Sequence, residues 1–367
     1  MRGLYVHIPY CVRKCSYCDF YSLPDRLETL DAYIQAVLQE AQKYSRLSFQ
    51  TIYIGGGTPS LLGAKHFNLL MDGLRDVLSL SNPLESTIEV NPESAKPEFF
   101  EAVKNAGFNR ISIGVQSLHD SELRTVGRVH TASQAASAIK LATQFNFQSI
   151  SADLMIGLPG QTSASLHKSL KTTVELGVEH LSVYCLSLEE GTSLANNPPP
   201  DLPSDDLQAK LFEETVKYLQ SCGFAHYEIS NFALPGFECQ HNLNYWHGGE
   251  YLGLGPAAAS HLDGKRFKNR ANLDAYLENP TAQIEYVEQL SNREKAAEEA
   301  MLRLRLLQEG LDADALAEKF GEQDTEAIVE RLDKMVKEGL LLNDGADYRL
   351  TPARILTSNP IFARVLG

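Results

Sequence analysis

Three cysteines lie close together near the start of the chain, at Cys11, Cys15 and Cys18 in the stretch HIPYCVRKCSYCDFYS. A structural zinc ion takes four ligands, usually as two pairs, and no second pair of cysteines or histidines follows at a usual spacing. A Cys-x-x-Cys redox pair would leave Cys11 without a role. The irons of a four-iron cluster normally take four thiolates, so three thiols would leave one iron open to a further ligand. The spacing therefore favours an iron–sulfur cluster.

Composition and charge limit which partners and which cellular compartment are expected for the protein. The formal net charge of the 367 residues is −14, which argues against a nucleic-acid partner because phosphate binding needs clustered Lys and Arg. The chain has no run of about 18 apolar residues and no apolar N-terminal stretch of signal-peptide length. The other cysteines, Cys185, Cys222 and Cys239, are scattered, as is typical of reduced thiols. We expect a cytoplasmic protein without an integral membrane segment, which leaves peripheral membrane contact open.

The elements that must position the cysteines come from a recurring unit of a short β-branched run, a turn and an amphipathic helical pattern. Strands are expected at LYVHI from Leu4, TIYIGG from Thr51, STIEV from Ser86, RISIGV from Arg110, SISADLMIG from Ser149 and HLSVYCLSL from His180. Six strands alternating with helices predict parallel β/α units with right-handed crossovers. We expect an α/β fold built as a partial (β/α)6 barrel, open on one side, with a doubly wound sheet as the alternative.

Several polar residues fall at the carboxyl ends of these strands, where parallel β/α folds build their active sites. The cysteines follow the first strand, and GGGTPS follows the second. Glu89 and Gln116 end the third and fourth strands, and Asp153 lies in the fifth. The sequence thus predicts one site at this end of the barrel.

The pattern changes after residue 225, so we divide the chain into a barrel core (1–225), a closing segment (226–285) and a C-terminal domain (286–367). The closing segment is rich in aromatics, Gly and His; we expect extended strands and loops, followed by a linker-like LENPTAQIEYVEQ. Three helices and two short strands about a DGAD turn then predict a small, helical, winged-helix-like domain. Its mixed charges favour a lid or docking surface over DNA binding, and homodimerisation through it stays open.

The Cys-x3-Cys-x2-Cys spacing after a first strand resembles the radical S-adenosylmethionine (SAM) superfamily, and the stretch Gly55–Pro59 resembles its glycine motif. The motifs YVHIPYC, YIGGGTPS, EVNPE, ISIGVQS, DLMIGLPGQ and HNLNYW together resemble the coproporphyrinogen dehydrogenase-like branch over essentially the whole chain. This resemblance implies a radical SAM barrel with a [4Fe-4S] cluster on Cys11, Cys15 and Cys18, and SAM bound at the open iron.

The resemblance also implies a set of SAM-binding residues. By position these are Tyr5, Tyr17, Gly56, Gly57, Thr58, Glu89, Gln116, Arg128, Asp153, Tyr184 and Ser187. The tyrosines at the start of the set would flank the cluster and SAM, the glycines and Thr58 would contact the methionine part, and the others would hold the amino acid, ribose and adenine. Carboxylates accept from ammonium and ribose hydroxyl groups, so the residue types suit these roles. Singly, each residue also has a structural explanation, such as a helix cap or a surface ion pair.

Two functions occur in this branch. In the coproporphyrinogen dehydrogenases a fourth cysteine stands two residues after the third and an N-terminal extension precedes the first strand, whereas this chain has Phe20 at that position and three residues before Leu4. The sequence instead resembles the HemW group of heme chaperones, including YCDF and HNLNYW. That resemblance implies heme binding and transfer to acceptor heme proteins.

Heme needs an iron ligand and flat apolar surface, for which His, Cys, Tyr and Trp are suitable. His241 and His247, on either side of the chain's only Trp, Trp246, are the first candidates, with Tyr245 and Cys239 as alternatives. A structural explanation is equally open, in which HNLNYW packs as a hairpin against the barrel and His241 bonds a backbone group. The rival functions are an oxygen-independent coproporphyrinogen III dehydrogenase, which would decarboxylate a propionate oxidatively, and a non-enzymatic metal-stabilised interaction module. The sequence does not decide between a catalyst and a carrier.

Overall fold

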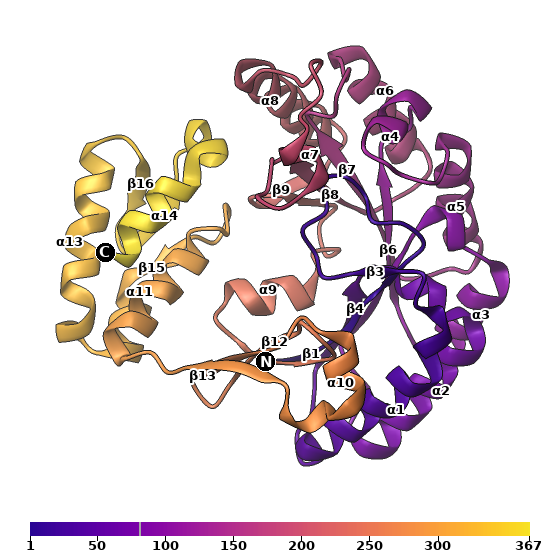
Figure 1. Ribbon diagram of the computed structural model, residues 1–367. Coiled ribbons are helices and arrows are strands. Elements are labelled where there is room, and N and C mark those ends of the chain that lie inside the picture. The colour runs from indigo at the N-terminus through magenta and orange to yellow at the C-terminus, as the bar shows by residue number, and fades with distance from the viewer. Residues whose placement is uncertain (81) are drawn as a thin grey trace.

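A sheet of twelve strands organises most of the molecule in the computed structural model, which describes residues 1–80 and 82–367 (Figure 1). Its centre is six parallel strands in chain order: β1 (Arg2–Ile8), β4 (Thr51–Gly56), β5 (Glu85–Val90), β6 (Arg110–Gln116), β7 (Ser149–Ile156) and β8 (His180–Cys185). The predicted α/β fold with a partial six-unit barrel is confirmed. The short parallel pair β2 (Tyr10–Cys11) and β3 (Leu23–Pro24) lies apart from this sheet.

The central strands form where buried β-branched residues alternate with polar or small ones. Ile111, Ile113 and Val115 of β6 are fully buried, and Ile88 pairs with Ile111 across the β5–β6 ladder. Such runs have high strand propensity because branched side chains pack well on a pleated surface.

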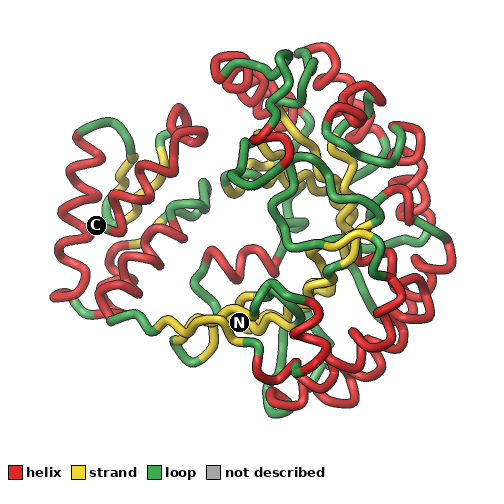
Figure 2. Tube along the Cα trace, in the orientation of Figure 1, coloured by secondary structure: helices red, strands yellow, loops and turns green. Residues whose placement is uncertain are grey.

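Helices cover the outer face of the barrel (Figure 2). They are α1 (Leu30–Ala41), α2 (Gly63–Val77), α3 (Pro97–Asn105), α4 (Asp120–Thr125), α5 (Ala132–Gln144), α6 (Ser163–Glu175) and α8 (Asp205–Ser221), with 3-10 turns at Leu27–Thr29, Gln42–Tyr44, Pro59–Leu62 and Pro92–Ser94. The short helix α7 (Ser193–Asn196) lies instead beside the loop that follows β2. Capping boxes begin α5 at Thr131 and α6 at Thr162. Between sheet and helices, aromatic rings such as Phe67 and Phe108 pack edge to face, 5.3 Å between centroids.

The closing segment extends both edges of the barrel. At one edge, β11 (Glu250–Leu254) pairs parallel with β1 and is followed by β12 (Ala259–Leu262), β13 (Lys265–Asn269) and β14 (Ile284–Glu288). At the other, β10 (Asn231–Ala233) and β9 (Ala225–Glu228) continue from β8. Two expectations are corrected. HNLNYW lies in a helix, α9 (Gln240–Trp246), rather than in strands and loops, and LENPTAQIEYVEQ contains the end of α10 (Leu273–Glu278), a 3-10 turn (Pro280–Ala282) and β14 rather than a linker.

The C-terminal domain has its own core, which includes Ile328, Leu332 and Phe362. Its elements are α11 (Asn292–Arg303), β15 (Leu311–Asp312), α12 (Ala313–Phe320), α13 (Glu322–Lys337), β16 (Leu341–Asp344), β17 (Asp347–Leu350), a 3-10 turn (Pro352–Thr357) and α14 (Ser358–Leu366). The winged-helix-like order of three helices and a two-stranded wing is confirmed, and β15 and α14 add to it. Across residues 1–80 and 82–367, no helix has the length and apolar character needed to cross a membrane.

Candidate cluster and cofactor site

The three cysteines lie on one loop at the carboxyl end of the barrel. Cys11 ends β2, and Cys15 and Cys18 follow in a turn in which the Cys18 amide donates to the Cys15 carbonyl at 3.2 Å. The Ser16 backbone bonds neighbouring loops on both sides: its amide donates to Val126 O at 3.1 Å, and its carbonyl accepts from the Leu194 amide at 2.8 Å. All three thiols are free and partly buried. The loop is therefore fixed by backbone contacts that do not use the thiols.

The cysteine loop borders a cavity of about 400 Å³, which we call the cysteine cavity. Residues expected to bind the cluster or SAM make up much of its wall: Cys11, Cys15, Tyr17, Cys18, Gly56, Gly57, Glu89, Gln116, Arg128, Asp153, Tyr184 and Ser187. All residues of the expected SAM set except Tyr5 and Thr58 thus line one space together with the three cysteines.

Tyr5 and Thr58 lie just outside this cavity. The Tyr5 hydroxyl bonds His7 Nδ1 at 2.9 Å, and its ring lies 6.3 Å from that of Tyr53. The Thr58 hydroxyl donates to Cys11 Sγ at 3.4 Å. Both residues therefore support the wall of the site rather than form it.

Two donors face the thiols. Thr58 Oγ1 reaches Cys11, and Arg128 Nη1 donates to Cys15 Sγ at 3.7 Å. Hydrogen bonds and a nearby cation stabilise thiolates, the form that binds metal, whereas burial raises the pKa of the Cys18 thiol to about 11. Within the described part of the chain no three His, Cys, Asp or Glu side chains are arranged to hold a single metal ion. Three thiols that border one cavity, two of them accepting hydrogen bonds, are a suitable donor set for an iron–sulfur cluster.

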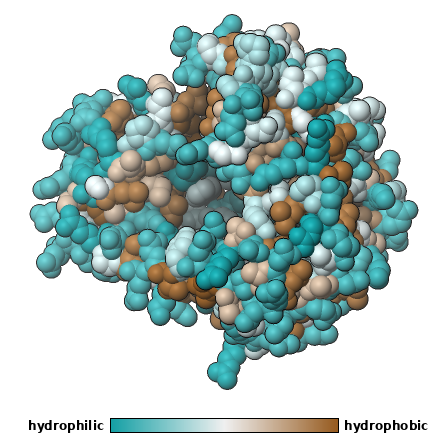
Figure 3. All heavy atoms as spheres, viewed as in Figure 1, coloured by the Kyte–Doolittle hydropathy of each residue, from teal (hydrophilic) through white to brown (hydrophobic). Residues whose placement is uncertain are grey.

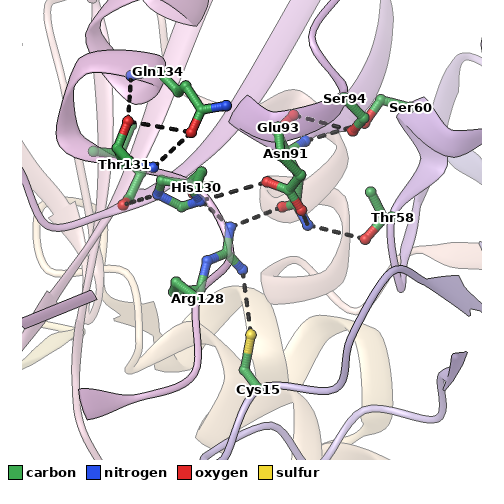
Figure 4. Close-up of polar contacts among 12 residues, drawn as sticks. Cys15, Thr58, Ser60, Asn91, Glu93, Ser94, Arg128, His130, Thr131 and Gln134 are labelled. Carbon is green, nitrogen blue, oxygen red and sulfur yellow. Dashed lines mark hydrogen bonds and ion pairs between the residues drawn. The ribbon is translucent and has the colours of Figure 1, made fainter. Parts of the chain in front are cut away.

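Asn91, which the sequence analysis did not single out, connects these donors (Figure 4). It accepts from Arg128 Nη2 at 3.0 Å and donates from Nδ2 to Thr58 Oγ1 at 2.9 Å. Arg128 Nη2 also donates to Gly114 O at 2.8 Å. The available signal was the motif EVNPE, in which only Glu89 was assigned a role.

The glycine stretch is required by the chain's own packing. A Cβ on Gly57 would lie 2.5 Å from the Tyr10 carbonyl oxygen, and Gly56 has a φ of +108° with His7 2.7 Å from its Cβ position. The Gly57 amide donates to Ile8 O at 2.8 Å, so this backbone lies directly against the strand that leads to Cys11. Glycine is therefore needed here before any ligand is considered.

Two half-buried carboxyl groups face the cavity. Glu89 accepts from the Tyr53 hydroxyl at 2.8 Å and from the Gly56 amide at 3.2 Å, while Asp153 accepts from the Ser112 hydroxyl at 3.1 Å. Burial, with the charge of Asp153, raises the pKa of Glu89 to about 7, and burial raises the pKa of Asp153 to about 6. A cationic ligand would lower both values and be held by both acids.

The rim of the cavity carries the remaining expected residues. Gln116 has a φ of +63°, a left-handed conformation uncommon for a residue other than glycine. Tyr184 is 44% exposed and Phe20 is 64% exposed, and both line the cavity. The rim thus exposes two large aromatic side chains to solvent, more than is usual beside a cavity.

The candidate heme residues lie elsewhere. Helix α9 packs against the amino ends of the strands, where Glu85 at the start of β5 accepts from the His241 amide at 3.0 Å and from the Cys239 thiol at 3.3 Å. His241 is 1% exposed; its Nδ1 bonds Thr51 Oγ1 at 2.8 Å and its Nε2 bonds the Tyr245 hydroxyl at 2.7 Å. Burial lowers the pKa of His241 to about 3. Both ring nitrogens are therefore occupied by side chains of the fold.

Trp246 and His247 instead face the C-terminal domain. The guanidinium carbon of Arg305 lies 4.3 Å from the Trp246 ring, and His247 Nε2 bonds Glu309 Oε2 at 2.8 Å. The His247 side chain is 32% exposed. Of the four candidate heme ligands, Tyr245 and His247 at the carboxyl end of α9 are partly exposed, whereas Cys239 and His241 are buried.

Comparisons with known proteins agree with this geometry. The profile of the Radical SAM superfamily matches residues 5–173, and that of the HemN C-terminal domain matches residues 290–356. The structure of coproporphyrinogen III oxidase (HemN) from Escherichia coli, a radical SAM enzyme, superposes with a TM-score of 0.87 at 24% identity, covering 100% of this chain and 89% of that one. The open barrel with three cysteines at its carboxyl end is thus the fold of a radical SAM protein with a HemN-type C-terminal domain.

Sequence relatives define the family more narrowly. Heme chaperone HemW of Lactococcus lactis is 34% identical over 366 residues, with 99% of this chain and 96% of the relative covered. Heme chaperone HemW of Escherichia coli is 37% identical over 354 residues, covering 94% and 93%, and that of Bacillus subtilis is 34% identical over 378 residues, covering 100% of both. The chain belongs to the HemW family.

Proposed function

We propose that this protein is a heme chaperone, which binds heme and transfers it to acceptor heme proteins. The observation that carries the proposal is the full-length identity to relatives named heme chaperone HemW. Phe20 supports it physically, because this exposed side chain beside Cys18 offers apolar surface to a macrocycle and cannot ligate iron. The scattered cysteines Cys185, Cys222 and Cys239 are free thiols, which suits the reducing cytoplasm, where we place the protein.

We further propose that Cys11, Cys15 and Cys18 would hold a [4Fe-4S] cluster and that the residues lining the cysteine cavity would hold SAM beside it. Such a cluster supplies a one-electron reductant when bound. The half-buried acids Glu89 and Asp153 would accept from the ammonium or ribose hydroxyl groups of SAM. Arg128 is already bonded through both Nη atoms, which supports a positioning role toward Cys15 and Asn91.

For the heme iron we propose His247 ahead of His241. A ligand nitrogen needs a free lone pair, and both nitrogens of His241 are engaged inside the fold. His247 is bonded through Nε2 to the half-exposed Glu309, a surface contact that a ligand can displace.

Anaerobic reconstitution followed by iron and sulfide analysis tests the cluster. We expect about four irons per chain, because three thiolates suffice for a four-iron cluster with one open iron. Stoichiometric zinc in place of iron would contradict the assignment and favour a metal-stabilised interaction module.

Titration with heme, followed through a shift of the Soret band, tests the chaperone function. A parallel assay of the same reconstituted protein with coproporphyrinogen III separates the two functions of the branch. Heme binding without conversion to protoporphyrinogen IX supports the proposal, whereas conversion would identify a dehydrogenase.

A further inference from the structure

A second cavity, of about 260 Å³, lies where the C-terminal domain meets the end of the last barrel strand; we call it the junction cavity. Strand β8 contributes Tyr184 and Cys185, and the C-terminal region contributes Arg305 and Leu356. In the space-filling view the surface is hollowed between these two parts of the molecule (Figure 3). Tyr184 and Cys185 also line the cysteine cavity, so a ligand in the junction cavity would border the proposed SAM site.

Arg305 brings an unpaired positive charge into the junction cavity. Among the described residues no carboxylate lies within the 4.0 Å ion-pair distance of its guanidinium, and its buried Nε has no hydrogen-bond partner. The guanidinium carbon instead lies over two aromatic rings, 4.3 Å from the centroid of Trp246 and 5.5 Å from that of Phe362. Aromatic stacking fixes the plane of a guanidinium while leaving its terminal N–H donors free to bind.

Glu228, the acid whose charge acts on Arg305, forms no ion pair with it. Glu228 uses its Oε1 to accept from the Ser230 amide at 3.0 Å and from the Asn231 side chain, and its Oε2 has no hydrogen-bond partner. Burial lowers the pKa of Arg305, and the Coulomb attraction of Glu228 opposes this shift without reversing it. The cavity therefore favours an anionic group that can bond the guanidinium directly.

We propose that Arg305 binds the carboxylate of a heme propionate, so that the junction cavity holds the propionate edge of the macrocycle. This inference rests on the proposed function. A carboxylate matches the planar fork of a guanidinium and can accept two parallel hydrogen bonds from it.

The rest of the cavity suits a ligand with one anionic edge and an apolar face. Its lining includes polar groups from Ser230, Ser358 and Asn359 and apolar side chains from Ile229 and Leu356. Leu356 is 42% exposed and Tyr184 is 44% exposed, which is unusual for large side chains lining a cavity. Covering them with a porphyrin would remove this apolar surface from water.

The test compares heme with its dimethyl ester, which lacks both carboxylates, in the wild-type protein and in Arg305→Gln. We expect the wild type to bind heme about tenfold more tightly than the ester, because a charge-assisted hydrogen bond is lost. We expect Arg305→Gln to bind both ligands with equal affinity, and Arg305→Lys to recover part of the preference.

Arg303→Gln is the matched control, because Arg303 lies two residues away and already faces Glu309 at 3.8 Å. It should keep the wild-type preference. Fluorescence of Trp246, the chain's only Trp, reports whether the stacked region is intact in each variant.

The outcomes separate the two proposals. A wild type that binds no heme would overturn the proposed function and this inference with it. A wild type that binds heme and its ester equally, or an Arg305→Gln variant that keeps the full preference, would overturn this inference alone. Should Arg305→Gln fail to fold, the wild-type ratio and Arg305→Lys still decide it.

Discussion

The Asn91 side chain accepts a hydrogen bond from Arg128 Nη2 at 3.0 Å and thereby links the donors to Cys11 and Cys15. Arg128 donates to Cys15, and Asn91 donates to Thr58, which donates to Cys11. In the series Arg128, Asn91, Thr58 and Cys11, each residue donates a hydrogen bond to the next. The two thiols are thus held by one network from three different loops.

Replacing Asn91 with Ala should weaken cluster binding, because it breaks the network while leaving the cysteines in place. Residues that orient metal ligands typically change metal affinity by about ten- to a hundredfold. We expect the cluster of Asn91→Ala to be lost to a chelator at least about tenfold faster than that of the wild type, followed by its visible absorbance under anaerobic conditions.

Asn109→Ala is the control for this prediction. Asn109 bonds the Ser86 amide at 2.8 Å at the amino end of the same strands, far from the cysteines along the chain. Equal rates of cluster loss in Asn91→Ala and Asn109→Ala would show that the network does not support the cluster.

The two histidines that flank Trp246 should behave differently on substitution. His241→Ala removes a buried ring bonded to Thr51 and Tyr245, and leaving such partners unsatisfied should lower the free energy of unfolding by about 2–4 kcal/mol. His247→Ala should change stability by less than about 0.5 kcal/mol, because its contact is at the surface.

Urea unfolding and heme titration together check this prediction. We expect His247→Ala to unfold like the wild type and to show a weaker, altered Soret band with heme. A stable His241→Ala protein that has lost heme binding, beside a His247→Ala protein that binds normally, would reverse the assignment.

Much of the barrel could be predicted from the sequence, because buried parallel strands are short runs of β-branched residues separated by helices. TIYIGG matches β4 from Thr51 to Gly56. Helix α9 was not predicted because QHNLNYW has few strong helix formers. Its amino end is held by a hydrogen bond from the Gln240 amide to Glu85, which lies 155 residues earlier in the sequence. Strand β14 is exposed on all five residues and so carries no hydrophobic alternation.

The site was predictable to the extent that its residues carry distinctive chemistry. Cysteines, acids and glycines at strand ends are recognisable one by one, and the fold brings nearly all of them to one cavity. Asn91 and Arg305 were not recognisable, since an amide and an arginine gain their roles only from what lies opposite them. Nor does a motif such as HNLNYW reveal which end of the barrel it will occupy.

The stability of the protein should depend on pH through His226. Burial lowers its pKa from 6.5 to about 4, although its bond to the Ile229 carbonyl opposes the shift. A histidine that is neutral in the fold takes up a proton on unfolding, so its contribution is present above pH 6.5 and is lost as the pH falls toward 4.

His226→Phe isolates this contribution, because it preserves the stack on Phe232, 4.1 Å between centroids, and cannot titrate. We expect its free energy of unfolding to fall less steeply between pH 6.5 and 4 than that of the wild type, by up to about 1.4 kcal/mol per pH unit. His167→Phe, at an exposed position, should keep the wild-type slope. Parallel pH profiles for all three proteins would contradict the buried neutral histidine.

Glu89 should make the affinity for SAM rise with pH, while its contribution to folding stability falls. Its pKa is raised to about 7, so in the SAM-free protein its contribution to stability is lost as the pH rises from 4.5 to about 7. In the folded protein, the Glu89 carboxylate that accepts from a cationic ligand forms around pH 7. We therefore expect the affinity of the reconstituted protein for radiolabelled SAM, measured by equilibrium dialysis, to rise between pH 6 and 8.

Glu89→Gln should remove most of this rise and bind SAM about tenfold more weakly at pH 8, since a charge-assisted hydrogen bond becomes a neutral one. Glu85→Gln is the matched control, because Glu85 begins the same strand and bonds α9 at the other end of the barrel. Iron content is measured for each variant so that SAM affinity is compared at equal cluster occupancy. If Glu89→Gln kept the wild-type pH profile, the group that binds the cationic part of SAM would have to be sought elsewhere, with Asp153 and its pKa of about 6 the next residue to replace.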